Sequence, residues 1–146
     1  MNTSSINHRS EQIDAATRST WQTRAMAIVA ALVANVIILI AGRVVNGEFP
    51  IATVGSDDQT IGFVQVIGVT VLVGLVAWGM LALLERTTSR AKAIWTAIAV
   101  IIFLLSLLGP LGSGVNTSSQ VVLACLHVGA AATIIPLMRR SAAMRG

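Results

Sequence analysis

Charge is scarce in this sequence. Only 11% of the 146 residues are Asp, Glu, Lys or Arg, whereas soluble domains carry about 25%. The chain also has a single cysteine, Cys125, which cannot form an internal disulfide or a C-x-x-C redox pair, and this argues against thiol oxidoreductase chemistry. No charged residue lies in the middle of a long apolar run, so the usual marker of an ion pathway through a membrane is missing.

Hydrophobic residues, by contrast, make up 55% of the chain, and the mean hydropathy is +0.81. A bilayer core of about 30 Å needs roughly 20 apolar residues per helical span, and four runs come close to or exceed that length. We therefore predict an all-α integral membrane protein whose residues 21–138 form a four-helix up-down transmembrane bundle. The predicted spans are residues 25–41, 61–84, 92–110 and 120–138.

The segments outside the predicted bundle are polar. Residues 1–20 are rich in Ser, Thr and Asn and hold too few apolar groups to offset the entropy of ordering, so we expect a disordered or loosely helical cytoplasmic tail. Residues 139–146 form a short basic cytoplasmic tail. Within the bundle, Pro110 is predicted to end the third span, and Pro136 to kink or end the fourth.

The basic residues are distributed unequally. Nine of the ten fall on one side of the predicted bundle, and the other side has Arg43 with the acidic residues Glu48, Asp57 and Asp58. The positive-inside rule then places both termini in the cytoplasm and the protein in the cell membrane. Charges positioned beside the spans argue against nucleic acid as a partner and indicate the lipid bilayer, with anionic headgroups on the cytoplasmic side. The nine are Arg9, Arg18, Arg24, Arg86, Arg90, Lys92, Arg139, Arg140 and Arg145.

The three tryptophans follow the same polarity. Trp21, Trp78 and Trp95 each lie near the cytoplasmic end of a predicted span, where indole rings favour the headgroup region. We therefore expect all three rings on the cytoplasmic side of the bundle.

Each span also carries one polar side chain near its outer end: Asn35, Gln65, Ser106 and His127. At a rise of 1.5 Å per residue, these four lie roughly 6–10 Å below the outer boundary, in one layer. Asn35 and His127 are spaced from alanines of their own spans so that each lies on a stripe of small residues, which lets membrane helices approach closely. We expect His127 to point into the bundle, within hydrogen-bond reach of one of the other three, directly or through one water.

This polar layer allows two interpretations. It is either a set of interhelical hydrogen bonds that fix the helix register, or a pocket that opens outward and binds a ligand headgroup or exchanges a proton at His127. We expect no cofactor and no metal site, because Cys125 lies about 200° around the helix from His127 and His8 lies in the tail on the other side. Ser106 and His127 lack an acidic orienting residue and an oxyanion hole, so we expect no enzyme activity.

Two short segments, residues 105–111 (LSLLGPL) and 126–128 (LHV), resemble a family of small, uncharacterised bacterial four-span membrane proteins that is classed as a domain of unknown function. The resemblance covers roughly residues 24–138. It implies a bacterial cytoplasmic membrane and draws attention to Ser106 and Pro110 together with His127, but it implies no activity.

Other four-span classes fit the residues less well. Small multidrug exporters need a glutamate in the first span, where this chain has only Asn35. Dual-topology fluoride channels lack such a one-sided charge distribution, and quinone-linked disulfide enzymes need cysteines. Two function classes remain. One is a non-enzymatic accessory or structural membrane protein, within a homo-oligomer or a larger membrane complex. The other is a small transporter or ligand-binding protein that uses the polar layer around His127.

Overall fold

The computed structural model describes residues 3–46, 50–51, 59–60, 62–112 and 117–143. The described part is almost entirely helical, with one pair of two-residue strands between the first two helices. In chain order the elements are α1 (Thr3–Asn46), β1 (Pro50–Ile51), β2 (Gln59–Thr60), α2 (Phe63–Thr87), α3 (Ala91–Ser106), α4 (Leu108–Gly112) and α5 (Thr117–Ala143).

In the part of the chain that the structure describes, four helical segments are long and apolar enough to cross a membrane, which confirms the predicted all-α, four-span fold. Each candidate span is somewhat longer than the sequence predicted, because the helices continue into the polar flanks of the apolar runs. The strands β1 and β2 pair antiparallel, with Pro50 opposite Thr60. The candidate spans are Thr20–Val45, Phe63–Thr87, Ala91–Leu111 and Thr117–Ala142.

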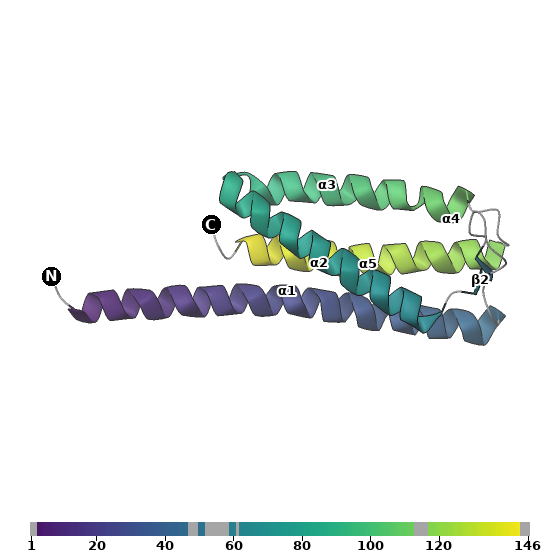
Figure 1. Ribbon diagram of the computed structural model, residues 1–146, viewed down its shortest axis with the longest axis horizontal. Coiled ribbons are helices and arrows are strands. Elements are labelled where there is room, and N and C mark those ends of the chain that lie inside the picture. The colour runs from purple at the N-terminus through teal and green to yellow at the C-terminus, as the bar shows by residue number, and fades with distance from the viewer. Residues whose placement is uncertain (1–2, 47–49, 52–58, 61, 113–116, 144–146) are drawn as a thin grey trace.

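The four long helices run alternately up and down, so that α1 begins and α5 ends at the same end of the bundle (Figure 1). α1 packs against α2 and α5, and α3 packs against the other side of the same two helices. α2 crosses the bundle obliquely: the beginning of α2 lies beside α1, and the end of α2 lies beside α3 (Figure 1). The first half of α2 is therefore drawn away from α3.

Close approach to α1 occurs at two glycines. A Cβ atom added to Gly129 would lie 2.6 Å from Cδ1 of Ile38, and one added to Gly74 would lie 2.8 Å from Cγ1 of Ile28. Since real side-chain atoms do not approach so closely, the missing Cβ atoms are what allow α5 and α2 to contact α1 here. Small residues play this role at membrane helix interfaces generally.

Three helix boundaries can be compared with the predictions. α1 begins at Thr3, so residues 3–19 are helical, which is one of the two alternatives expected for this tail. α3 ends at Ser106, before Pro110, which lies inside α4; proline cannot donate a hydrogen bond to the carbonyl four residues earlier, which here belongs to Ser106. α5 continues through Pro136 to Ala143, so this proline does not end the helix.

The tryptophans gather at the end of the bundle where α3 begins, but one of them is not a headgroup anchor. The rings of Trp21 and Trp78 meet edge to face, with centroids 6.2 Å apart. Trp95 is only 1% exposed, and its Nε1–H donates to the carbonyl of Ala77 at 3.0 Å. Trp95 therefore lies between helices rather than on the surface of the bundle, because α2 supplies both apolar contacts and an acceptor for the indole N–H. Trp95 belongs to a buried cluster with Ala27, Ala31, Leu81, Ile134 and Met138.

Candidate functional site

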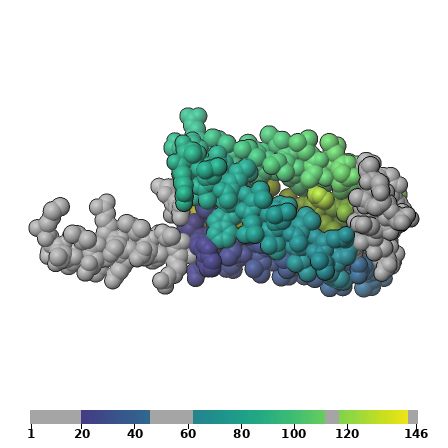
Figure 2. Space-filling view, viewed as in Figure 1, coloured from purple at the N-terminus to yellow at the C-terminus, as the bar shows by residue number. Residues whose placement is uncertain are grey.

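A cavity of about 570 Å³ lies between α2, α3 and α5, with α1 contributing Asn35. This volume is within the range of about 300–1,000 Å³ that is typical of small-molecule sites. Its walls are almost wholly apolar; they include Val69, Val73, Phe103 and Ile134. Figure 2 shows a hollow between α2 and α3, through which α5 is visible. The oblique course of α2 therefore opens the cavity toward the side of the bundle.

All four residues of the predicted polar layer line this cavity. Asn35 is the most deeply placed of them, at 4% exposed. Its Nδ2 donates to Oγ1 of Thr70 at 3.0 Å, and this bond joins α1 to α2 inside the bundle. Its Oδ1 atom is buried and has no hydrogen-bond partner among the residues that the structure describes. An unpaired buried polar atom is costly. This acceptor lies against Gly129 of α5, 3.1 Å from the position that a Cβ atom there would take, and it belongs to a residue that lines the cavity, so its missing donor calls for an explanation.

His127 reaches the cavity from α5, but its observed bond is not the one predicted. Nδ1 lies 2.7 Å from the carbonyl oxygen of Leu123, one turn earlier in the same helix. Because a carbonyl oxygen only accepts, Nδ1 carries the proton of this bond, and Nε2 of the neutral ring is then an acceptor. Within the described residues, no direct hydrogen bond joins His127 to Asn35, Gln65 or Ser106.

Gln65 and Ser106 also bond within their own helices. Oε1 of Gln65 accepts from the backbone N–H of Gly62 at 2.8 Å and so caps the start of α2. Oγ of Ser106 donates to the carbonyl of Phe103 at 2.7 Å, just before α3 ends. The four polar residues thus share one cavity without bonding to one another.

Sequence reasoning missed Thr70, which supplies the buried hydroxyl that Asn35 contacts. A threonine in a membrane helix is a weak indication of a contact between helices, because its hydroxyl commonly donates to a backbone carbonyl one turn earlier in the same helix. Thr133 does so with the carbonyl of Gly129 at 2.9 Å. The helical period does favour Thr70, because Val66, Thr70 and Gly74 repeat every four residues and all three are buried.

A second polar cluster, also missed, lies at the opposite end of the bundle. The guanidinium of Arg24 on α1 forms an ion pair with Glu85 on α2, and the two side chains are 3% and 10% exposed. Nε of Arg24 also donates to Oγ of Ser141 on α5 at 3.1 Å. The sequence signal was available: Glu85 is the only acidic residue after Asp58, and it stands among basic residues.

Comparison with known proteins assigns the chain to a family. The family of unknown function DUF6069 matches residues 15–144. The chain belongs to this family. The DUF6069 match spans all four membrane helices and the cavity between them, and it agrees with the resemblance to a domain of unknown function. No curated protein and no solved structure matches the chain.

Proposed function

We propose that this DUF6069 protein is a non-enzymatic membrane protein that binds a long apolar molecule with a hydrogen-bond-donating end group, such as a hydroxyl or an amine. The observation that carries the proposal is a 570 Å³ cavity lined by Asn35, a residue 4% exposed whose buried Oδ1 has no hydrogen-bond partner among the residues that the structure describes. This favours the ligand-binding class over a purely structural role, because register-fixing hydrogen bonds between helices do not require an empty volume beside them.

The donor character of the ligand follows from the polar atoms of the cavity. Oδ1 of Asn35 and, in the neutral ring, Nε2 of His127 are acceptors, and the hydroxyl proton of Ser106 is already given to Phe103. A ligand that donates to these atoms would satisfy them, whereas a carbonyl or an ether would leave them unpaired. The engagement of the Ser106 proton with a backbone carbonyl also differs from a nucleophile–base pair, which supports a binding rather than a catalytic role.

The apolar, elongated shape of the ligand follows from the course of the cavity along α2. Its walls extend from Gln65 to Met80, and fifteen residues at 1.5 Å each correspond to roughly 22 Å. Trp95 stands near one end and the polar atoms near the other. The lateral hollow between α2 and α3 (Figure 2) would let such a molecule enter from the lipid.

Trp95 provides a direct test of this orientation. In a Trp21→Phe, Trp78→Phe background, Trp95 is the only tryptophan of the chain. A long-chain alcohol brominated at the end of its chain should quench Trp95 fluorescence strongly, and the same alcohol brominated beside the hydroxyl should quench it weakly. Ser106 lies eleven residues, or roughly 16 Å, from Trp95 along the span, so the two bromine positions are well separated.

The variants for this experiment separate cavity binding from partition into the micelle. Ala99→Phe fills the cavity and should abolish the quenching, whereas Leu104→Phe, on an exposed face of the same helix, should leave it unchanged. His127→Phe should weaken binding about fivefold, the loss expected for one hydrogen bond, and His127→Gln, which keeps an acceptor, should restore most of it. Equal quenching by both alcohols, or by a brominated alkane without the hydroxyl, would contradict the proposal.

We further propose that both termini lie in the cytoplasm, with the protein in the cytoplasmic membrane. The exposed basic residues Arg86, Arg90, Lys92, Arg139 and Arg140 belong to the α2–α3 turn and the end of α5, which lie at one end of the bundle (Figure 1). This supports the orientation favoured by the positive-inside rule.

Cysteine labelling in cells tests the orientation. In a Cys125→Ser background, a membrane-impermeant thiol reagent added outside should label Thr117→Cys and should leave Arg90→Cys unlabelled until the membrane is opened. Both positions are exposed, so access to the reagent depends on the side of the membrane. The reverse labelling pattern would overturn the orientation and leave the cavity proposal untouched.

A further inference from the structure

We propose a second ligand site in this protein: the groove between the beginning of α3 and the end of α5 binds the headgroup and upper acyl chain of an anionic phospholipid. The groove has a volume of about 720 Å³ and is lined by Arg90, Lys92 and Arg139 at one end and by Val100 and Ile101 at the other. The groove lies outside the central cavity, and its ligand carries an anionic end group instead of a hydrogen-bond-donating one. This second proposal therefore does not depend on the function proposed above.

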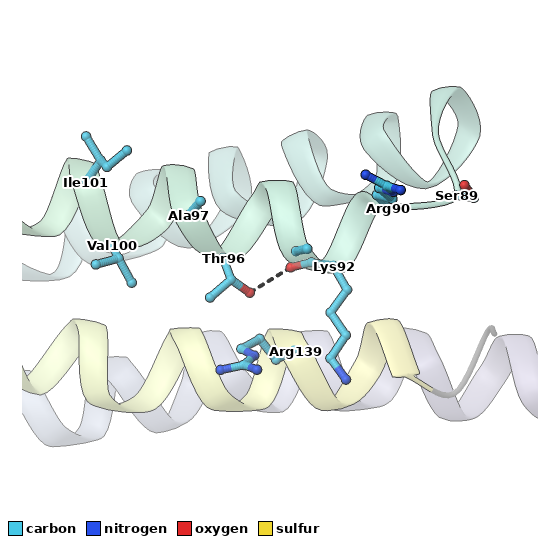
Figure 3. A pocket seen from close by; sticks show the side chains of 9 residues that line it. Ser89, Arg90, Lys92, Thr96, Ala97, Val100, Ile101 and Arg139 are labelled. Carbon is cyan, nitrogen blue, oxygen red and sulfur yellow. Dashed lines mark hydrogen bonds between the residues drawn. The ribbon is translucent and has the colours of Figure 1, made fainter.

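Cations from two helices converge on this groove. Figure 3 shows the side chain of Lys92 extending from α3 toward α5, with Arg139 on the facing side of α5. Both side chains are exposed. Like charges that face each other across a helix interface repel, and an anion placed between them would replace repulsion with two attractions.

No acidic side chain in the described part of the chain neutralises this groove. Glu85 is the only acidic residue whose side chain the structure describes; it pairs with Arg24 of α1 and does not line the groove. Thr96 also lines the groove, but its hydroxyl is neutral and donates to the carbonyl of Lys92 at 2.7 Å. It therefore does not compensate the positive charge. The charge of the groove is therefore available to a ligand.

The start of α3 adds to the positive potential. Arg90 is the N-cap residue of α3 and makes no side-chain capping bond. The N–H of Ala93 donates to the carbonyl of Arg90 at 3.0 Å, and the helix dipole places a partial positive charge at this end of α3. Phosphate groups bind at helix ends of this kind, and Arg90 and Lys92 from the start of α3 line the groove.

The lower part of the groove favours a lipid over a free anion. Ala97, Val100 and Ile101 continue the groove along α3, and Ile101 lies nine residues, or roughly 13 Å, beyond Lys92. A small phosphate would use only the charged end. A phospholipid would place its phosphate between the cations and its acyl chain along the apolar wall, in the direction of the hydrocarbon core. Basic pockets between membrane helices bind anionic headgroups in this way.

Native mass spectrometry of the full chain in a neutral detergent tests the site, with phosphatidylglycerol and phosphatidylcholine of the same acyl chains as probes. The wild-type protein should bind phosphatidylglycerol preferentially. Each cation near an anionic lipid surface is worth about a fivefold change in affinity. The Lys92→Gln, Arg139→Gln double variant should therefore lose about 30-fold in affinity for phosphatidylglycerol and little for phosphatidylcholine.

The matched control removes two cations from the same end of the protein but outside the groove. The Arg86→Gln, Arg140→Gln variant has the same net charge as the test variant, and it should keep the preference for phosphatidylglycerol. Equal losses in both variants would mean that general surface charge attracts the lipid and would overturn the proposal. So would displacement of bound lipid by inorganic phosphate, because this would identify a small-anion site.

A measurement on the wild-type protein guards against a variant that fails to fold. The preference for phosphatidylglycerol should decrease as the salt concentration rises, because screening weakens contacts between exposed charges. A preference that does not change with salt would contradict a site built from Lys92 and Arg139.

Discussion

Replacing Arg24 by methionine should destabilise the protein by about 3–5 kcal/mol, the cost of breaking a buried ion pair by removing one partner. The carboxylate of Glu85, whose side chain is 10% exposed, would lose the guanidinium that compensates its charge. The bond from Arg24 to Ser141 on α5 would also be lost. Because Arg24 joins α1 to both α2 and α5, the variant should loosen the contacts of three helices. Reversible unfolding in mixed detergent micelles would measure the change.

A double variant separates the cost of an orphaned charge from the value of the pair. Removing both charges, as in Arg24→Met with Glu85→Met, leaves no buried ion behind, and replacement of a buried pair by apolar residues is often neutral or stabilising. We therefore expect the double variant to be far more stable than Arg24→Met alone. If the two substitutions instead destabilise additively, the residues do not interact as the structure has them.

The number of membrane-spanning helices could be predicted from the sequence, because length and hydropathy alone decide whether a segment can span a bilayer. The inward face of α1 was predictable as well. Ala27, Ala31 and Asn35 recur every four residues and are all buried. The period of the helix fixes which residues share a face, so this kind of inference needs no knowledge of neighbouring helices.

The contacts between helices were less predictable. Asn35 was expected within a layer of four polar residues, but its bond goes to Thr70, while Gln65 caps its own helix. Depth along the membrane does not determine which side chains meet, because rotation and crossing of the helices decide that. The oblique course of α2, which opens the cavity, depends on close approaches such as that of Gly74 to Ile28, and a single sequence does not reveal them.

Replacing Trp95 by alanine should destabilise the protein by about 3 kcal/mol. This is the lower end of the range for removing a large buried side chain, because the hydrophobic transfer contribution is weak between helices in a membrane and the loss of packing remains. Trp95 is 1% exposed, packs within the buried cluster that includes Leu81 and Met138, and donates to Ala77. Trp95→Phe keeps most of the packing and loses the N–H donor, so it should cost about 1 kcal/mol.

The comparison with Trp21→Ala distinguishes a core residue from a headgroup anchor. Trp21 is 58% exposed and contacts Trp78 through an edge-to-face arrangement, so its removal should cost about 0.5–1.5 kcal/mol in the same unfolding measurement. If both indoles acted as headgroup anchors, as the sequence pattern suggested, the two alanine variants should unfold with similar free energies. Trp95 also lines the central cavity. A large difference between the unfolding free energies of the two alanine variants would therefore indicate that a core residue bounds this end of the cavity, where a bound chain would contact the indole ring.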